Sequence, residues 1–217
     1  MDAEAGEGRE SGRGAEAKIR SVDWLGLPAR LKERDAKSYR PKSLDERLRR
    51  ERTRTEARLL VEARRAGVRT PVLYDIDLPK HRIVMEELPG ETLKQMIDAS
   101  PLEARPLLVA VESFGLTLGR LHAAGLSHGD LTSSNVLFPS GPTGPPAFID
   151  LSMGSRNASV EEQGIDLHLV EEDLKALHPK SATLIRAFLT GYRAGNPRQH
   201  APVLKRVKEI RGRVRYA

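Results

Sequence analysis

Apolar and polar residues alternate in two different ways in the first part of the chain, and each way predicts a different element. Short apolar alternations in residues 15–34, broken by one glycine and one proline, predict strands. Residues 72–77 and 82–87 predict a second strand pair, joined by a Leu-Pro-Lys turn. Between these pairs, leucines recur among charged residues over residues 43–66 without Pro or Gly, which predicts one long helix.

The rest of the chain has a mainly helical pattern. Helices are predicted over residues 92–99, 102–124, 165–176, 181–194 and 202–210. Two short apolar runs, 136–138 and 147–151, flank a turn rich in Gly and Pro and predict a small hairpin. The predicted fold class is therefore α+β: a small lobe of antiparallel sheet plus one helix, followed by a helical lobe.

The same pattern divides the chain into segments. Residues 1–13 are rich in Glu, Gly and Ala with hardly an apolar anchor, so we expect them to be disordered. The strand-rich lobe then takes residues 14–88 and the helical lobe residues 89–200. Residues 201–217 form a basic C-terminal helix or tail.

Composition limits where the protein works. The chain has 217 residues, of which 39% are hydrophobic, enough to build a core. It contains no cysteine and shows no apolar stretch near its start that resembles a secretion signal. No run approaches the roughly eighteen apolar residues of a membrane span. We therefore expect a cytoplasmic protein that does not contact a membrane.

The net charge of +6 is unevenly distributed. Residues 186–217 hold nine Lys or Arg against one acid, and residues 30–65 hold fourteen against seven. Such blocks attract polyanions or acidic protein surfaces, with nucleic acid the commonest partner. We expect the C-terminal block to contact a partner, because it lacks acids of its own. For residues 30–65, a solvated surface laced with salt bridges is an open alternative.

The candidate chemistry lies in HGDLTSSN, residues 128–135, and in the later run FIDLS, residues 148–152. Phosphoryl transfer needs a carboxylate near the attacking hydroxyl, a divalent metal on the phosphates and a cation on the non-transferred phosphates. Asp130, Asn135 and Asp150 supply the oxygen ligands that Mg²⁺ prefers, at the spacing of a kinase catalytic loop and metal-binding strand end. These residues predict a metal–phosphate site at the junction of the two lobes.

Around this loop the sequence resembles the protein-kinase superfamily, and more closely the small atypical kinase of the KEOPS complex. The motifs that carry the resemblance are GAEA at 14–17, ERTRTEARLL at 51–60, GIDLHLVEEDL at 164–174, HP at 178–179 and RGR at 211–213. The resemblance implies a two-lobed protein-kinase-like fold. Its C-lobe is expected to be truncated, since only 67 residues follow Asp150 and no Ala-Pro-Glu stretch is present.

Carried over position by position, the resemblance implies roles for individual residues. Asp130 becomes the catalytic base, and Asn135 and Asp150 become the metal ligands. Lys32 is expected to contact the nucleotide phosphates, with Glu56 on a helix as its ion-pair partner.

The remaining implied contacts surround the nucleotide. Gly14, Glu16 and Ala17 take the place of the glycine loop, although GAEA is a weak match to G-x-G-x-x-G. Glu86 and Leu88 are expected to form the hinge against adenine. The implied cofactors are ATP and Mg²⁺, with Mn²⁺ as a substitute.

Two residues are expected to support the catalytic loop, and two positions depart from the family pattern. His128 and Asp166 are the expected supports, Asp166 from the start of a helix. Ser152 stands where the family has Gly, which removes the flexibility that Gly provides. Gly129 stands where kinases have Arg, so no cation is available for an activation-loop phosphate. We expect activity to be governed by a partner.

The resemblance implies which partners these are. ATP hydrolysis or autophosphorylation would support the threonylcarbamoyl transferase subunit of KEOPS, which modifies the adenosine next to the anticodon of tRNA. A small helical adaptor subunit and tRNA itself are the other expected partners, with the basic tail directed toward the transferase or tRNA.

Two other functions are open at this stage. HGD followed by Asn also occurs in small-molecule kinases such as aminoglycoside and choline phosphotransferases, although these need a larger helical acceptor pocket. A non-catalytic scaffold that binds tRNA or a partner through its basic face is the second alternative, and Ser152 keeps it open.

Overall fold

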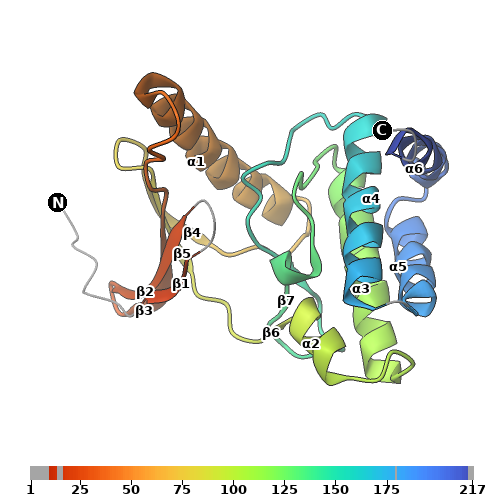
Figure 1. The fold of residues 1–217 in the computed structure, drawn as a ribbon. Helices are drawn as coiled ribbons and strands as arrows, with labels where there is room; N and C mark the ends of the chain where they lie inside the picture. Colours follow the sequence, from red (N-terminus) through yellow and green to blue (C-terminus); the bar gives the residue numbers. More distant parts are fainter. Residues whose placement is uncertain (1–9, 14–16, 179, 215–217) are drawn as a thin grey trace.

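Two lobes, one built on a sheet and one on helices, make up the part of the chain that the computed structural model describes, residues 10–13, 17–178 and 180–214 (Figure 1). The N-lobe contains β1 (Glu10–Arg13), β2 (Lys18–Trp24), β3 (Leu27–Glu33), α1 (Lys42–Arg65), β4 (Leu73–Asp77) and β5 (Arg82–Glu86). The C-lobe contains β6 (Glu91–Thr92), α2 (Leu93–Ala99), α3 (Arg105–Ala123), a 3₁₀ turn (Ser133–Asn135), β7 (Val136–Phe138), β8 (Ala147–Phe148), α4 (Val160–Leu177), α5 (Ala182–Gly195) and α6 (His200–Val214). The predicted α+β, two-lobed architecture is confirmed.

The N-lobe sheet is antiparallel, with the strand order β1-β2-β3-β5-β4. Side chains at successive positions of a strand point to opposite faces, so β3 serves two environments. Ala29 and Leu31 pack in a small core with Val22 and Val84. Lys32 points to the other face, where it meets α1. A single strand thus contributes both to the core and to the space between the lobes.

Strand β1 corrects, for residues 10–13, the prediction that residues 1–13 are disordered; residues 1–9 lie outside the described residues. Glu10 pairs with Arg20 and Arg13 pairs with Lys18, so β1 forms the edge of the sheet. An edge strand is held by backbone hydrogen bonds, which need no apolar side chain. Composition therefore gave no sign of this strand.

Helix α1 runs without interruption over 24 residues and links the sheet to the C-lobe (Figure 1). The leucines that predicted it form its inner face, and Leu59, Leu60 and Ala63 are almost fully buried in the main core. Gly67, at φ +78°, follows its end and turns the chain toward β4.

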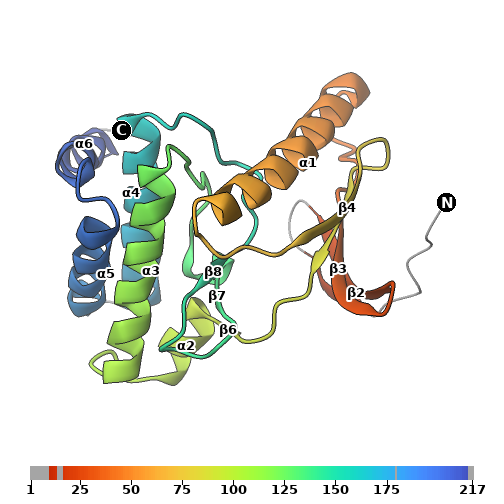
Figure 2. The ribbon, with the colours of Figure 1, turned by 180° about the vertical axis from the view of Figure 1, so that it is seen from behind.

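The C-lobe is a layer of helices packed around α3 (Figure 2). Helices α3 and α5 approach closely through glycines; a Cβ on Gly191 would lie 1.9 Å from the carbonyl oxygen of Glu112. Helix α4 begins at Val160, before the predicted position 165, because Ser159 and Glu162 form a capping box that starts it earlier. None of the helices in the described residues is long and apolar enough to span a membrane.

The predicted hairpin is part of a three-stranded sheet in the order β6-β7-β8. Strand β6 is only two residues long, and its pairing with β7 could not be deduced from so short a pattern. The second strand of the hairpin was predicted over residues 147–151, but β8 ends at Phe148. Ile149, Asp150 and Leu151 therefore lie beyond the strand.

Candidate active site

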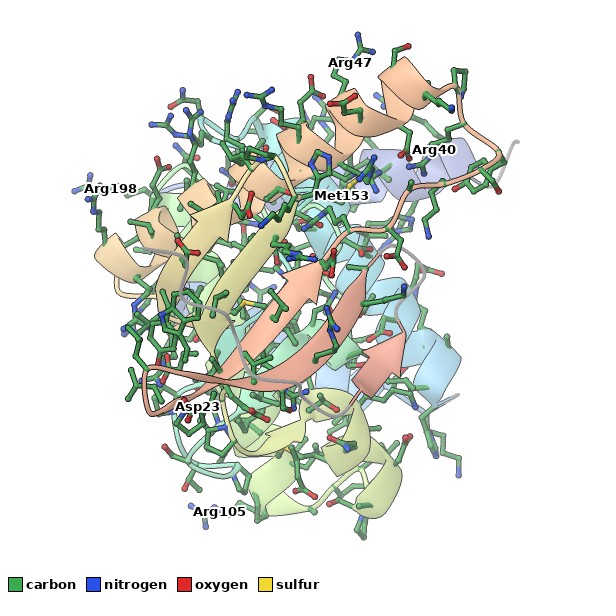
Figure 3. The ribbon with its side chains drawn as sticks, turned by 90° about the vertical axis from the view of Figure 1, so that its left-hand side faces the viewer. Asp23, Arg40, Arg47, Arg105, Met153 and Arg198 are labelled. Carbon is green, nitrogen blue, oxygen red and sulfur yellow. The ribbon has the colours of Figure 1, made fainter. Side chains whose placement is uncertain are left out.

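A cavity of about 350 Å³ is lined by residues of both lobes. The N-lobe contributes Ala17, Ile19, Lys32, Arg34 and Arg52, and the loops of the C-lobe contribute Gly129, Asp130, Asp150, Ser152 and Met153. Four residues expected from the sequence, Ala17, Lys32, Asp130 and Asp150, therefore share one cavity. Figure 3 views the molecule from the N-lobe side, with Met153 labelled near the middle of α1.

Lys32 is held between two carboxylates from different parts of the chain. Its Nζ lies 2.8 Å from Oε1 of Glu56 on α1 and 2.7 Å from Oδ1 of Asp150. Lys32 and Glu56 are both buried. The ion pair with Glu56 fixes the ammonium, and the pair with Asp150 directs it across the cavity to the other lobe.

Arg34 is a second buried cation in this site, and none of the sequence motifs pointed to it. Its Nη2 lies 2.6 Å from Oε2 of Glu56, the oxygen that Lys32 does not use. Its Nε and Nη1 have no hydrogen-bond partner among the described residues, although the side chain is only 3% exposed. The signal was available: Arg34 follows Lys32 by two positions, so along a strand both point the same way.

Asp150 combines an unusual backbone with a strongly acidic side chain. Its φ is +59°, in the left-handed region that Asp tolerates better than most residues. Burial alone would raise the pKa of this carboxyl, but the Lys32 ammonium and a 2.7 Å hydrogen bond donated by the Ser152 hydroxyl lower the pKa to about 2. The carboxylate is therefore ionised at any ordinary pH and ready to bind a cation.

Ser152 has a different effect from the one its sequence position suggested. Asp150, and not residue 152, takes the positive φ, so the backbone of residue 152 does not need the freedom of Gly. The Ser152 hydroxyl orients the Asp150 carboxylate instead.

The catalytic loop is anchored by one buried carboxylate. Asp166, in the second turn of α4, accepts hydrogen bonds from the backbone N–H groups of His128 at 2.7 Å and Gly129 at 2.8 Å. The Nδ1 of His128 accepts from the backbone N–H of Asp130 at 3.4 Å, so its Nε2 carries the proton and donates to the Ile149 carbonyl at 3.1 Å. Burial lowers the pKa of His128, which keeps the ring neutral. These contacts fix Asp130 relative to Asp150.

A second layer of buried groups holds Asp166 in place. Nε2 of His122 lies 3.1 Å from Oδ2 of Asp166, and Nδ1 of the same ring lies 2.9 Å from the Tyr192 hydroxyl. A carboxylate only accepts, so Nε2 of His122 donates to Asp166. Burial is the largest single influence and opposes ionisation of Asp166, but the hydrogen bonds and charges of His122 and His128 together lower the pKa of Asp166. Tyr192 lies 70 residues from His122, and no local pattern indicated its contribution.

Asn135 does not line the cavity but lies on a segment next to that of Asp150, and together they offer the oxygen donors that suit a magnesium ion. Nδ2 of Asn135 donates to the Asp130 carbonyl at 2.8 Å, which leaves the amide oxygen free to bind a cation. The backbone N–H of Ile149 donates to the Asn135 carbonyl at 3.1 Å, so Asn135 and Asp150 are held on neighbouring segments. Among the described residues no three His, Cys, Asp or Glu side chains form a metal cage. A metal here would complete its coordination with phosphate and water, as Mg²⁺ does.

Gly129 is required by close packing of two loops. Its φ is +80°, and a Cβ on it would lie 2.0 Å from the Met153 carbonyl oxygen. The segment after Asp150 is hydrogen-bonded to the start of the catalytic loop, because the backbone N–H of Ser127 donates to the Ser155 carbonyl at 3.0 Å. No side chain, and so no arginine, fits at position 129 in this arrangement.

The predicted hinge residues are not among those that line the cavity. Glu86 accepts hydrogen bonds from Arg69 at 2.7 Å and from the backbone N–H of Val72 at 3.0 Å, and neither Glu86 nor Leu88 lines the cavity. Arg30 lies on the same face of β3 as Lys32, nearer the hinge, and is paired with Glu87 at 2.9 Å. Gly14 and Glu16 lie outside the described residues.

The chain is similar to known proteins in sequence and in fold. A family model described as "RIO domain" matches residues 29–164. The KEOPS complex subunit Bud32 of Pyrococcus abyssi is 38% identical over 174 residues, which cover 77% of this chain and 77% of that protein. A probable bifunctional tRNA threonylcarbamoyladenosine biosynthesis protein of Methanosarcina mazei is 40% identical over 193 residues.

The match to the bifunctional protein covers 88% of this chain but 32% of that one, so the chain spans about a third of the length of such relatives. Among solved structures, the Rio2 kinase–ADP/Mg²⁺–phosphoaspartate complex of Chaetomium thermophilum aligns with a TM-score of 0.60 at 17% identity. The alignment covers 95% of this chain and 70% of that one. At this identity the likeness concerns the fold.

Proposed function

This chain belongs to the RIO-domain family and to the family of the KEOPS subunit Bud32, and from that premise we propose that it is an atypical serine/threonine kinase and ATPase. Its ATP turnover would support threonylcarbamoyladenosine modification of tRNA by a partner transferase. The observation that carries the proposal is Lys32, fixed by Glu56 and directed at Asp150 inside a cavity between the lobes.

Each charged group in the cavity has a part in this chemistry. The Lys32 ammonium would bind the non-transferred phosphates, and Asp150 with Asn135 would hold Mg²⁺, or Mn²⁺ in its place. The metal, when bound, would neutralise charge on the phosphates. Asp130 would accept the proton of the attacking hydroxyl or water, because Asp166 fixes the backbone of its loop. The nucleotide would extend from Ala17 toward Glu86 and Leu88.

Control by a partner fits the loop geometry. The close contact between Gly129 and Met153 leaves no space for an arginine that would read an activation-loop phosphate. The positions of the catalytic loop and the following segment would then depend on a bound protein. We propose the KEOPS threonylcarbamoyl transferase subunit and a helical adaptor subunit as those partners, with tRNA in the same complex.

The test is Mg²⁺-dependent ATP turnover by the purified chain, alone and with the transferase partner plus tRNA. Asp150→Ala should reduce turnover by at least about 10²-fold, since it removes a metal ligand. Asp98→Ala is the matched control: Asp98 also pairs with a lysine, Lys94 at 2.8 Å, but on the outside of α2. Turnover that survives in Asp150→Ala, or that is absent from the wild type in both settings, would reject the catalytic proposal.

A further inference from the structure

Helix α1 carries a row of exposed arginines on the side opposite its buried face. We call this row the arginine stripe; it consists of Arg47, Arg50, Arg54, Arg58 and Arg65. At 3.6 residues per turn the five side chains fall within about 80° of the helix circumference, and they extend over about 27 Å. In Figure 3 the labelled Arg47 projects outward from α1 at the upper edge of the molecule.

The structure sorts the basic residues of this region into two groups. Those that face inward have acidic partners: Arg49 pairs with Asp45, and Lys32 and Arg34 pair with Glu56. In the part of the chain that the structure describes, no arginine of the stripe makes an ion pair or a side-chain hydrogen bond. The ion pairs of these residues thus lie on the inner face of α1, and the exposed arginines of its outer face make none in the described part of the chain.

The acids of α1 are in large part committed elsewhere. Asp45 and Glu56 are buried in the pairs just described, and Glu62 pairs with Arg156 at 2.9 Å. Only Glu46 and Glu51 are left exposed on the helix. The stripe also places Arg50, Arg54 and Arg58 four residues apart, where like charges repel. Glu46 stands four residues before Arg50 and Glu51 four residues after Arg47, so two acids are interspersed, but the five exposed arginines outnumber them.

Part of the C-terminal block behaves in the opposite way. Arg206 and Arg213 of α6 each pair with Glu161 of α4 at 3.1 Å, and Arg211 pairs with Glu171. Residues 186–217 hold only one acid of their own, but folding brings α4 against α6 and gives these three arginines acidic partners. Among the described residues, four other bases of this block are exposed and make no ion pair or side-chain hydrogen bond, Arg193, Arg198, Lys205 and Lys208, but the row of five arginines along one helix face lies on α1.

We infer that the arginine stripe binds the phosphate backbone of an RNA. Arginine is suited to phosphate, because its planar guanidinium donates two parallel hydrogen bonds. The stripe contains no apolar anchor of the kind that a protein interface buries at its centre. The choice of RNA among polyanions rests on the function proposed above, but the stripe lies on the opposite side of α1 from Glu56, so binding does not depend on turnover.

The test compares two triple charge reversals in the full-length chain, by fluorescence anisotropy with a labelled, unmodified tRNA transcript. The stripe variant is Arg50→Glu/Arg54→Glu/Arg58→Glu. The control is Arg105→Glu/Arg193→Glu/Arg198→Glu, which changes three exposed arginines of the C-lobe and gives the same net charge. Urea unfolding and circular dichroism establish that both variants are folded, whether or not either of them turns over ATP.

The stripe variant should bind tRNA at least about tenfold more weakly. The negative slope of log K against log[KCl] should become shallower by about 2–3, since each lost phosphate contact reduces the size of the slope by nearly one. The control should keep most of the affinity and the slope. Equal losses in the two variants would mean that only net charge matters and would overturn the inference. Unchanged tRNA binding with lost binding of the transferase partner would also overturn it, in favour of a protein interface.

Discussion

At the scale of single residues, Lys32 controls the ionisation of Asp150. Burial would raise the pKa of the Asp150 carboxyl, yet the Lys32 ammonium and the Ser152 hydroxyl hold it at about 2 against a usual 3.8. The folded-state pKa is below the unfolded one, so ionised Asp150 stabilises the fold above about pH 4. This contribution is lost as the pH falls toward about 2.

We predict that Lys32→Met raises the pKa of Asp150 to 3.8 or above, because burial then acts with less opposition. Glu56 keeps a cation in this variant, since Arg34 remains paired with it. Carbon-detected NMR titration of the Asp150 carboxyl measures the change. Lys94→Met, which removes an exposed lysine, should leave the midpoint at about 2; an unchanged midpoint in Lys32→Met would show that Lys32 is not the cause.

Gly129 offers a second test at this scale, with Gly26 as its matched control. Both have φ near +80°, but a Cβ on Gly26 has nothing within 4 Å, whereas one on Gly129 would meet Met153 at 2.0 Å. Gly26→Ala should cost about 1 kcal/mol of unfolding free energy, from backbone strain alone. Gly129→Ala should cost about 3 kcal/mol, because the loops must also separate. Urea unfolding measures both, and equal losses would contradict the proposed loop contact.

At the scale of elements, the sequence predicted the helices and strands that have a clear period and missed those that depend on distant partners. Helix α1 was predicted because its leucines recur at helical spacing over 24 residues. Strands β1 and β6 were missed because each is short and defined by pairing with another segment. The side chain of residue 166 was expected to brace the catalytic loop, but its own support by His122 and Tyr192 joins three helices and leaves no local pattern.

The charge pattern of α1 gives a prediction that belongs to the helix as a whole. Arg54 stands four residues from both Arg50 and Arg58, and each like-charge pair costs about 0.2–0.5 kcal/mol. Arg54→Glu turns both pairs into attractive ones, but it also turns the favourable pair of Arg54 with Glu51, three residues before it, into a repulsive one. We expect the variant to be more stable than the wild type by about 0.5–1 kcal/mol at low salt, even though RNA binding weakens.

Thermal unfolding checks this prediction, with a rise in Tm of about 1–4 °C for a chain of this size. The gain should disappear in about 1 M salt, where surface charges are screened. Arg54→Gln, which removes the repulsion without adding attraction, should show roughly half the gain. A loss of stability in Arg54→Glu would mean that Arg54 makes a stabilising contact and is not kept for binding.

At the scale of the whole molecule, the active site exists only where the two lobes meet. The sequence placed Asp130, Asn135 and Asp150 together because they lie close along the chain. It could not show that Arg34 would share Glu56 with Lys32, or that the Lys32 ammonium would reach Asp150, because these contacts join β3, α1 and the segment after β8. The motif spacing indicates the C-lobe residues that line the cavity, and only the folded structure shows which N-lobe residues face them.

This junction predicts how ligands affect the stability of the whole chain. The carboxylates of Asp130 and Asp150 both line the cavity, so the phosphates of metal-free ATP would meet negative charge there. With Mg²⁺ present, the same carboxylates become favourable. At ATP concentrations about 100 times Kd, binding should stabilise the fold by about 2.7 kcal/mol, which raises Tm by roughly 5–10 °C.

Differential scanning calorimetry with ATP, in Mg²⁺ and then in EDTA, measures the effect, and most of the rise should disappear in EDTA. Asp150→Asn should show a small rise in Tm in both conditions. In Mg²⁺ it lacks the charged metal ligand, and in EDTA it repels the phosphates less. Asp98→Asn should behave as the wild type. A rise of equal size in EDTA would mean that ATP binds through Lys32 and Arg34 alone. In that case the carboxylates of the cavity would not form a metal site in the chain alone. ATP would bind first, and the metal would bind only when the partner is present.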